Sequence, residues 1–172
     1  MRKLLIFSMI ILMSCISFSQ DEDKQATDDV TTFYFIRHSE KDRSNPSEEN
    51  PHLMQKGLER AEKWSRILGN VQFDAVYSSN YHRTMETAKP TADRNKLKIT
   101  MYDPHGVDVK RFVNENKGKH VLIVGHSNTI HSFVNALIGN EKYEEIDDSN
   151  NGNLYIVTII NGHIADQLLT IN

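Results

Sequence analysis

The chain has 172 residues, of which 38% are hydrophobic and 25% charged, and its formal net charge at pH 7 is −3. This length suffices for one domain with a full-sized core, and the composition is that of a globular protein rather than a disordered or fibrous one. The acidic balance argues against nucleic acid and against an anionic membrane surface as binding partners.

The N-terminus has the layout of a secretory signal peptide. Arg2 and Lys3 precede the short apolar stretch LLIFSMIIL, and small polar residues follow it. The small residues of "SFS" just before Gln20 suit ordinary signal cleavage, so we predict residues 1–19 to be removed and the protein to be periplasmic or secreted. An uncleaved N-terminal anchor is a further reading of the segment.

A second processing route involves Cys15, the only cysteine of the chain. The residues "LMSC" resemble a bacterial lipobox, which would make Cys15 a lipidated N-terminus and attach the protein to a membrane. Cleavage before Gln20 would instead leave no thiol for disulfide or thiolate chemistry. Residues 20–30 are polar and lack apolar periodicity, so we predict a flexible leader there and a single domain over residues 31–172.

The first half of that domain alternates strand-like and helix-like segments. Residues 31–36 (TTFYFI) predict a strand, and residues 44–52 a loop with two prolines. A helix is predicted from Met54 until Gly69-Asn70, because its apolar residues recur every three or four positions: Leu58, Ala61, Trp64 and Leu68. A short strand over 73–79 and a helix over 81–94 follow, in which Pro90 predicts a kink or an early end.

The second half repeats this alternation. We predict a strand over 97–102, a helix over 107–116, a strand over 120–125 whose unbroken apolar run suits a central position, and a helix over 127–139. Two strands, 153–160 and 163–171, form a hairpin around Asn161-Gly162. The fold class is therefore α/β: a three-layer sandwich with a mostly parallel central sheet, helices on both faces and a C-terminal edge hairpin.

Reactive side chains collect at the predicted carboxyl ends of the parallel strands, where open α/β sheets bind their ligands. In chain order these residues are Arg37-His38, Ser78-Ser79 with His82 and Arg83, Asp103, and Gly125-His126-Ser127. Two arginines, two or three histidines and the N-termini of two helices predict an anion site, and phosphate in particular.

The segments "RHSEK", "YSSNYHRTMETA" and "VGHSNTI" together resemble the three signature segments of the histidine phosphatase superfamily, the phosphoglycerate mutase-like proteins. The resemblance implies that His38 is the nucleophile and forms a phosphohistidine, and that Arg37, Arg83 and His126 complete the phosphate pocket. On electrostatic grounds we expect His126 to be protonated, because its charge would offset that of the transferring phosphoryl group. The resemblance places the carboxylic acid that protonates the leaving group at Asp103, with Asp108 as a competitor. No metal and no other cofactor is expected.

The chain departs from many members of that family in two ways. Ser39 stands where they have Gly, and the connections after His38 and Arg83 are short, which leaves little material for a lid. The chain therefore resembles the small, lid-poor phosphatase branch, which acts on phosphomonoesters or phosphohistidine, and mutase activity is disfavoured. We read Glu40 and Lys41 as a solvated loop pair. The substrate, a small phosphorylated molecule or a phosphoprotein, and the oligomeric state stay open.

Two other functions fit parts of the sequence. "HVLIVGHSNT" is similar to the nucleophile elbow of a serine hydrolase, with Ser127 as nucleophile, Asp147 or Asp148 as the acid, and His163 as the base. A non-catalytic phosphate-binding module on the same fold is the second alternative. A metal hydrolase is not predicted, because His126 and His131 lie five residues apart and do not share a helix face.

Overall fold

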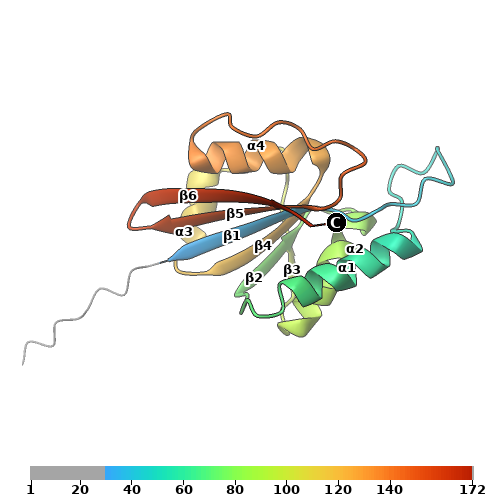
Figure 1. The fold of residues 1–172 in the computed structure, drawn as a ribbon, viewed down its shortest axis with the longest axis horizontal. Helices are drawn as coiled ribbons and strands as arrows, with labels where there is room; N and C mark the ends of the chain where they lie inside the picture. Colours follow the sequence, from blue (N-terminus) through green and yellow to red (C-terminus); the bar gives the residue numbers. More distant parts are fainter. Residues whose placement is uncertain (1–29, 172) are drawn as a thin grey trace, which may run out of the picture.

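The computed structural model describes residues 30–171 (Figure 1). Its elements are β1 (Thr31–Arg37), α1 (Gln55–Ile67), β2 (Ala75–Ser78), α2 (His82–Arg94), β3 (Ile99–Met101), α3 (Val109–Glu115), β4 (His120–Gly125), α4 (Ser127–Ile138), β5 (Asn153–Ile160) and β6 (His163–Thr170). Within these residues no helix has both the length and the apolar character needed to cross a membrane. The predicted signal peptide, the lipidation site at Cys15 and nearly all of the predicted leader lie outside them.

One six-stranded sheet, of order β3-β2-β4-β1-β5-β6, organises the chain. The first four strands of that order are parallel, and β5 and β6 add an antiparallel hairpin at the β1 side. Every residue of β4 after His120 is buried, as the apolar run predicted. The hairpin turn uses positive φ at Asn161 (51°) and Gly162 (81°), the geometry of a type I′ turn. The predicted fold class is confirmed.

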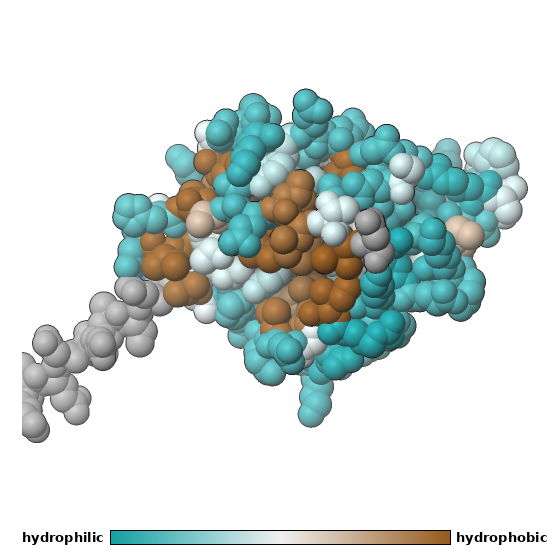
Figure 2. Space-filling view, viewed as in Figure 1, coloured by the Kyte–Doolittle hydropathy of each residue, from teal (hydrophilic) through white to brown (hydrophobic). Residues whose placement is uncertain are grey.

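The two faces of the sheet carry separate cores, because successive strand residues point to opposite sides. Phe33, Phe35, Val121 and Ile123 pack with residues of α3 and α4, whereas Ile36, Leu122 and Val124 pack with residues of α1 and α2. Figure 1 shows α4 on one side of the sheet and α1 with α2 on the other. In Figure 2 an apolar area lies over the hairpin region, where Ile160, Ile164, Leu168 and Leu169 are exposed.

Helix α1 differs in one respect from the predicted apolar face. Ala61, Trp64 and Leu68 are buried as predicted, but Leu58 is 43% exposed. The neighbouring Gly57 faces the protein instead, and a Cβ placed on it would lie 2.2 Å from the carbonyl oxygen of Glu40. The helix therefore approaches the segment after β1 through a glycine, and this close approach turns Leu58 outward.

Helix α2 continues through Pro90 to Arg94, so the predicted range 81–94 holds except for Tyr81, and the early end considered at Pro90 does not occur. A proline inside a helix costs about 3 kcal/mol relative to alanine. Ala88, Thr91 and Ala92 are buried beside Pro90, and Ser65 of α1 donates a hydrogen bond to the carbonyl oxygen of Pro90 (3.2 Å). Packing against α1 offsets the cost that the local pattern predicted.

Candidate active site

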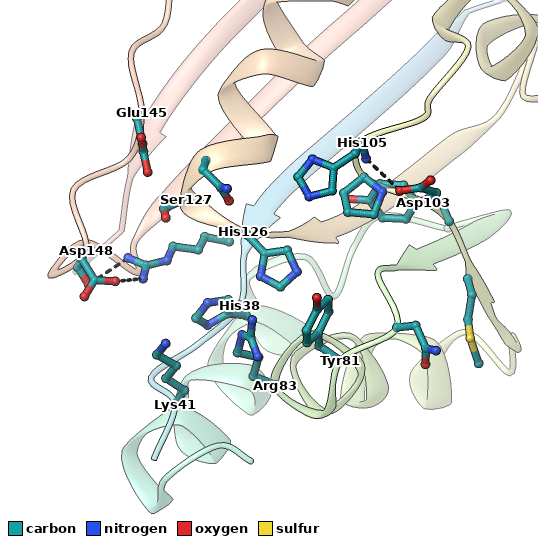
Figure 3. A pocket seen from close by; sticks show the side chains of 16 residues that line it. His38, Lys41, Tyr81, Arg83, Asp103, His105, His126, Ser127, Glu145 and Asp148 are labelled. Atoms are coloured by element: carbon teal, nitrogen blue, oxygen red, sulfur yellow. Dashed lines mark hydrogen bonds and ion pairs between the residues drawn. The ribbon is translucent and has the colours of Figure 1, made fainter. Parts of the chain in front are cut away.

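The carboxyl ends of the four parallel strands border a cavity of about 780 Å³. The five residues to which the family resemblance gives a role all line it: Arg37, His38, Arg83, Asp103 and His126. The structure adds several others that the sequence did not mark for the site, among them Lys41, Tyr81, His105, Glu145 and Asp148 (Figure 3). Helices α2 and α4 begin at its border, so their N-terminal backbone N–H groups favour an anion there.

His38 follows β1 directly and is 4% exposed. Its backbone N–H donates to the carbonyl oxygen of Gly125 (2.9 Å) on β4, and its carbonyl accepts from the side chain of Asn151 (2.9 Å). The ring Nδ1 lies 2.7 Å from the carbonyl oxygen of Ser39, which can only accept, so Nδ1 carries the proton. The lone pair is therefore on Nε2, where a nucleophile needs it.

The pKa of His38 is lowered to about 3, mainly by burial and also by the charges of Arg37, His126 and Arg83, whereas the Ser39 hydrogen bond acts in the opposite direction. The ring is therefore neutral at neutral pH. Ser39 is fully buried, and its backbone N–H donates to Oγ1 of Thr87 (2.9 Å), so a small residue other than glycine fits after His38.

His126 lies next to His38, with ring centroids 5.5 Å apart in an edge-on arrangement. Its Nε2 is 2.8 Å from the hydroxyl of Ser79, which follows β2 and holds the ring in place. Burial lowers the pKa of His126 to about 4, and Arg83, Arg37 and His105 lower it as well. The structure therefore favours a neutral His126 over the expected protonated one, because desolvation and neighbouring cations disfavour its charge.

Arg37 joins the site to the loop before β5. The side chain is 2% exposed, and its Nη1 donates to the carbonyl oxygens of Asp147 (3.0 Å), Asp148 (2.9 Å) and Asn150 (3.1 Å). Its Nη2 pairs with the carboxylate of Asp148, which also pairs with Arg43. Nε of Arg37 is buried and has no partner. Arg37 thus has a structural role that the sequence did not indicate.

Arg83 offers the most free hydrogen-bond donors of the site. Nε and Nη1 are buried and have no hydrogen-bond partner, and the guanidinium lies 4.4 Å from the ring centroid of Tyr81. The edge of the Tyr81 ring also contacts His126. Burial, together with repulsion from Arg37, lowers the pKa of Arg83. Buried donors without partners are costly, and an anion bound between them would satisfy them.

The predicted solvated pair, Glu40 and Lys41, is not solvated. Glu40 accepts three hydrogen bonds from Arg60, at 2.9 to 3.0 Å, and its side chain is only 14% exposed. Lys41 is half-buried and lines the cavity, and its pKa is lowered by burial and by Arg43 and Arg83. Lys41 therefore adds a cationic group to the site. Glu40 and Arg60 lie 20 residues apart in the chain, so no local sequence pattern indicated that they form an ion pair.

The depressed pKa values predict how the protein responds to pH. In the unfolded chain a histidine titrates near 6.5, so between about pH 4 and 6.5 the unfolded state binds more protons than folded His38 and His126 do. Their contribution to the free energy of unfolding should therefore be complete above this window and decrease as the pH falls through it. Ring ¹⁵N NMR should show both rings still neutral at about pH 5.

Urea unfolding at several pH values supplies the second measurement. His126→Gln should show a shallower loss of stability between neutral and acidic pH than the wild type. A ring of His38 or His126 that titrates near 6.5 in the ligand-free protein would contradict this account.

Known proteins can now be compared with this geometry. A sequence model described as "Histidine phosphatase superfamily (branch 1)" matches residues 33–103, a range that contains Arg37, His38 and Arg83. Residues 33–103 are thus similar to the histidine phosphatase superfamily. His126 lies beyond the matched range, and the fold brings it beside His38. No curated protein matches the chain in sequence.

Solved structures of histidine phosphatase relatives share the fold. A protein described as the phosphohistidine phosphatase SixA of Agrobacterium tumefaciens has a TM-score of 0.63 at 18% identity, over 82% of this chain and 99% of its own. The α-ribazole phosphatase of Shigella flexneri has 0.64 at 16%, over 81% and 96%. The phosphoglycerate mutase of Bacillus anthracis has 0.64 at 16%, over 85% and 95%. These identities support a common fold and nothing finer.

The two residues predicted as candidates for the acid differ in position. Asp103 lines the cavity, whereas Asp108 does not and instead caps α3 by accepting from the backbone N–H of Arg111 (3.1 Å). His82, named among the strand-end residues, faces away and stacks on His52, with centroids 4.1 Å apart. The third histidine in the cavity is His105, which lies in a loop and had no strand-end pattern to mark it.

The predicted serine hydrolase triad does not assemble. Ser127 lines the cavity, but His163 begins β6 beside Ile160, at the end of the sheet where β1 starts. The length of β1 separates the two ends by about 20 Å. In the part of the chain that the structure describes, no group of three or more His, Cys, Asp and Glu side chains could hold a metal ion.

Proposed function

We propose that the chain is a phosphatase that hydrolyses phosphomonoesters through a covalent phosphohistidine on His38. One observation carries the proposal: a buried, neutral imidazole with its lone pair on Nε2 lies among guanidinium groups that have unpartnered N–H donors. A neutral imidazole is a competent nucleophile, and fixed cations stabilise the charge on the transferring phosphoryl group.

The residues of the site have different roles in the proposed reaction. Nε of Arg37, the free nitrogens of Arg83 and the N-termini of α2 and α4 bind the phosphoryl oxygens, and His126 supplies a further polar contact. Nε2 of His38 attacks phosphorus in line with the leaving oxygen, and water then hydrolyses the phosphohistidine. The rigid placement of His38 by β4, Ser39 and Asn151 keeps the attacking nitrogen in position.

Hydrolysis is favoured over mutase chemistry by two short connections at the β2–β3 side of the cavity, whereas the connection from β1 to α1, which begins at His38 and was predicted to be short, has 17 residues. Three residues join β2 to α2, and seven join β3 to α3. A mutase must keep water away from its phosphoenzyme, which needs an enclosing segment. Phosphohistidine on a protein is a second candidate substrate, supported by the likeness to the structure described as SixA. A site with little cover suits a substrate carried on another protein.

Trapping the intermediate tests the proposal. The purified protein should hydrolyse p-nitrophenyl phosphate, and a rapid quench should give an acid-labile, alkali-stable phosphoryl group that peptide mass spectrometry places on His38. Ser127→Ala should keep hydrolysis within about fivefold of the wild type, because Ser127 has no covalent role. Preference for carboxylic esters with dependence on Ser127 would overturn the proposal, and phosphate binding without turnover would favour the non-catalytic module.

We also propose that the protein is exported, as the sequence of its N-terminus indicates. Its substrates would then be phosphorylated molecules outside the cytoplasm. The intact mass of the protein recovered from its native host distinguishes an N-terminus at Gln20 from a lipid-modified Cys15 and from an uncleaved chain, which would contradict export with cleavage.

A further inference from the structure

The turn between β3 and α3 contributes two titratable side chains to the cavity, Asp103 and His105. A phosphatase of the proposed kind needs a group that protonates the leaving oxygen and later activates water. The sequence resemblance placed this role at Asp103. The two side chains point in different directions, and this difference decides which of them can protonate the leaving oxygen.

The Asp103 carboxylate forms its hydrogen bond within the turn that carries it. Oδ1 accepts the backbone N–H of His105 (3.0 Å), and Oδ2 lies 2.9 Å from the point where a Cβ on Gly106 would stand. The carboxylate is therefore folded against the backbone of the turn. Figure 3 shows it on the side of the loop away from His38 and Arg83. Asp103 shapes the turn, and this turn presents the next titratable residue to the cavity.

The His105 ring has the opposite orientation. In Figure 3 it points into the cavity toward His126, and His38 lies on the far side of His126. The two rings are near enough for the charge of His105 to lower the pKa of His126. Within residues 30–171 the ring of His105 forms no hydrogen bond, so its N–H is free for a ligand. An in-line attack by His38 expels the leaving oxygen on the side of phosphorus opposite to His38.

The other carboxylates of the cavity are less suited. Asp148 is held by Arg37 and Arg43. Glu145 comes from the loop after α4 and lies beyond Ser127, near Asp148 (Figure 3). Both belong to the wall opposite the turn that carries His105.

We propose, on the basis of the phosphatase function above, that His105 is the general acid and base of the reaction in place of Asp103. As Nε2 of His38 forms its bond to phosphorus, the phosphorus–oxygen ester bond breaks and its electron pair goes to the leaving oxygen. The imidazolium of His105 gives that oxygen a proton, which yields the alcohol, a neutral His105 and phosphohistidine.

The second half-reaction returns the proton to His105. Neutral His105 takes a proton from water as the water oxygen attacks phosphorus, the nitrogen–phosphorus bond breaks, and its electron pair returns to His38. Inorganic phosphate leaves, and His105 is protonated again for the next cycle. Imidazole suits both directions, because a ring nitrogen can donate a proton in the first half-reaction and accept one in the second.

Leaving-group dependence tests this assignment. We compare kcat/KM, which reports the first half-reaction, for 2,4-dinitrophenyl phosphate, whose leaving group needs no proton, and phenyl phosphate, whose leaving group does. His105→Gln should lower the value for phenyl phosphate by about 10²-fold or more and that for the dinitrophenyl ester by less than about fivefold. His105→Gln retains the backbone N–H that Asp103 binds, so the turn is preserved.

Asp103→Asn is the matched control, and it should show no comparable dependence on the leaving group. A leaving-group-dependent loss in Asp103→Asn that equals or exceeds that of His105→Gln would assign the proton to Asp103 and overturn the inference. Equal losses on both esters in His105→Gln would also overturn it, since they indicate a binding role. Absence of His38-dependent hydrolysis of either ester by the wild type would refute the phosphatase function itself, and the inference with it.

Discussion

Replacing His38 with Ala should lower kcat/KM for aryl phosphates by at least about 10³-fold, because it removes the nitrogen that forms the covalent intermediate. Residual activity would come from the cations that still stabilise the transferring phosphoryl group. The variant leaves a space at the end of β1, so added imidazole should restore part of the rate by attacking phosphorus from the same position. Steady-state kinetics with and without imidazole measure both effects.

His82→Ala is the matched control for this variant. His82 belongs to the same sequence motif as Arg83, but it stacks on His52 outside the cavity. Its removal should leave kcat/KM within about twofold, since it touches neither substrate nor reacting atoms. A His38→Ala protein that keeps wild-type turnover, or a His82→Ala protein that loses it, would contradict the arrangement described for the site.

Arg37→Ala should combine a loss of activity with a loss of stability. Arg37 is 2% exposed and donates to three carbonyl oxygens and one carboxylate of the loop before β5. Removing it leaves these acceptors without their buried partner, at a cost of about 2–3 kcal/mol in the free energy of unfolding, toward the lower end because Asp148 is largely exposed. Urea unfolding and kinetics on the same preparation provide the two readouts.

Arg83→Ala separates the two effects. The buried nitrogens of Arg83 have no hydrogen-bond partner, so its removal leaves no acceptor unsatisfied. We expect a loss of about 10²-fold in kcat/KM with unchanged or slightly higher stability. If Arg37→Ala and Arg83→Ala lost equal stability, the structural role of Arg37 in holding the loop would be wrong.

Predictions that depend on neighbouring residues in the chain agree with the structure, except where contacts between distant segments override them. β4 and the β5–β6 hairpin begin and end as predicted, apart from one residue at the end of β6, because an unbroken apolar run and an Asn-Gly turn are local signals. Helix α2 ends at Arg94 as the predicted range had it, and the early end considered at Pro90 does not occur, since packing against α1 overrides a local propensity. Leu58 was placed on the buried face because the close approach of Gly57 to Glu40 is a contact between distant segments.

The sequence by itself determined the fold class and the meeting of Arg37, His38, Arg83 and His126. This was possible because parallel strands deliver their carboxyl ends to one edge of a sheet, wherever the intervening helices lie. The domain limits and the export signal stay predictions.

Only the tertiary structure decided what surrounds those residues. It placed His105 rather than His82 in the cavity, joined Arg37 to Asp148 across 111 residues, and directed the Nδ1 N–H of His38 to the carbonyl oxygen of Ser39. It also lowered the pKa values of His38 and His126 through burial. Side-chain direction, long-range pairing and desolvation depend on how turns and neighbouring elements pack, and the local residue pattern does not encode that packing.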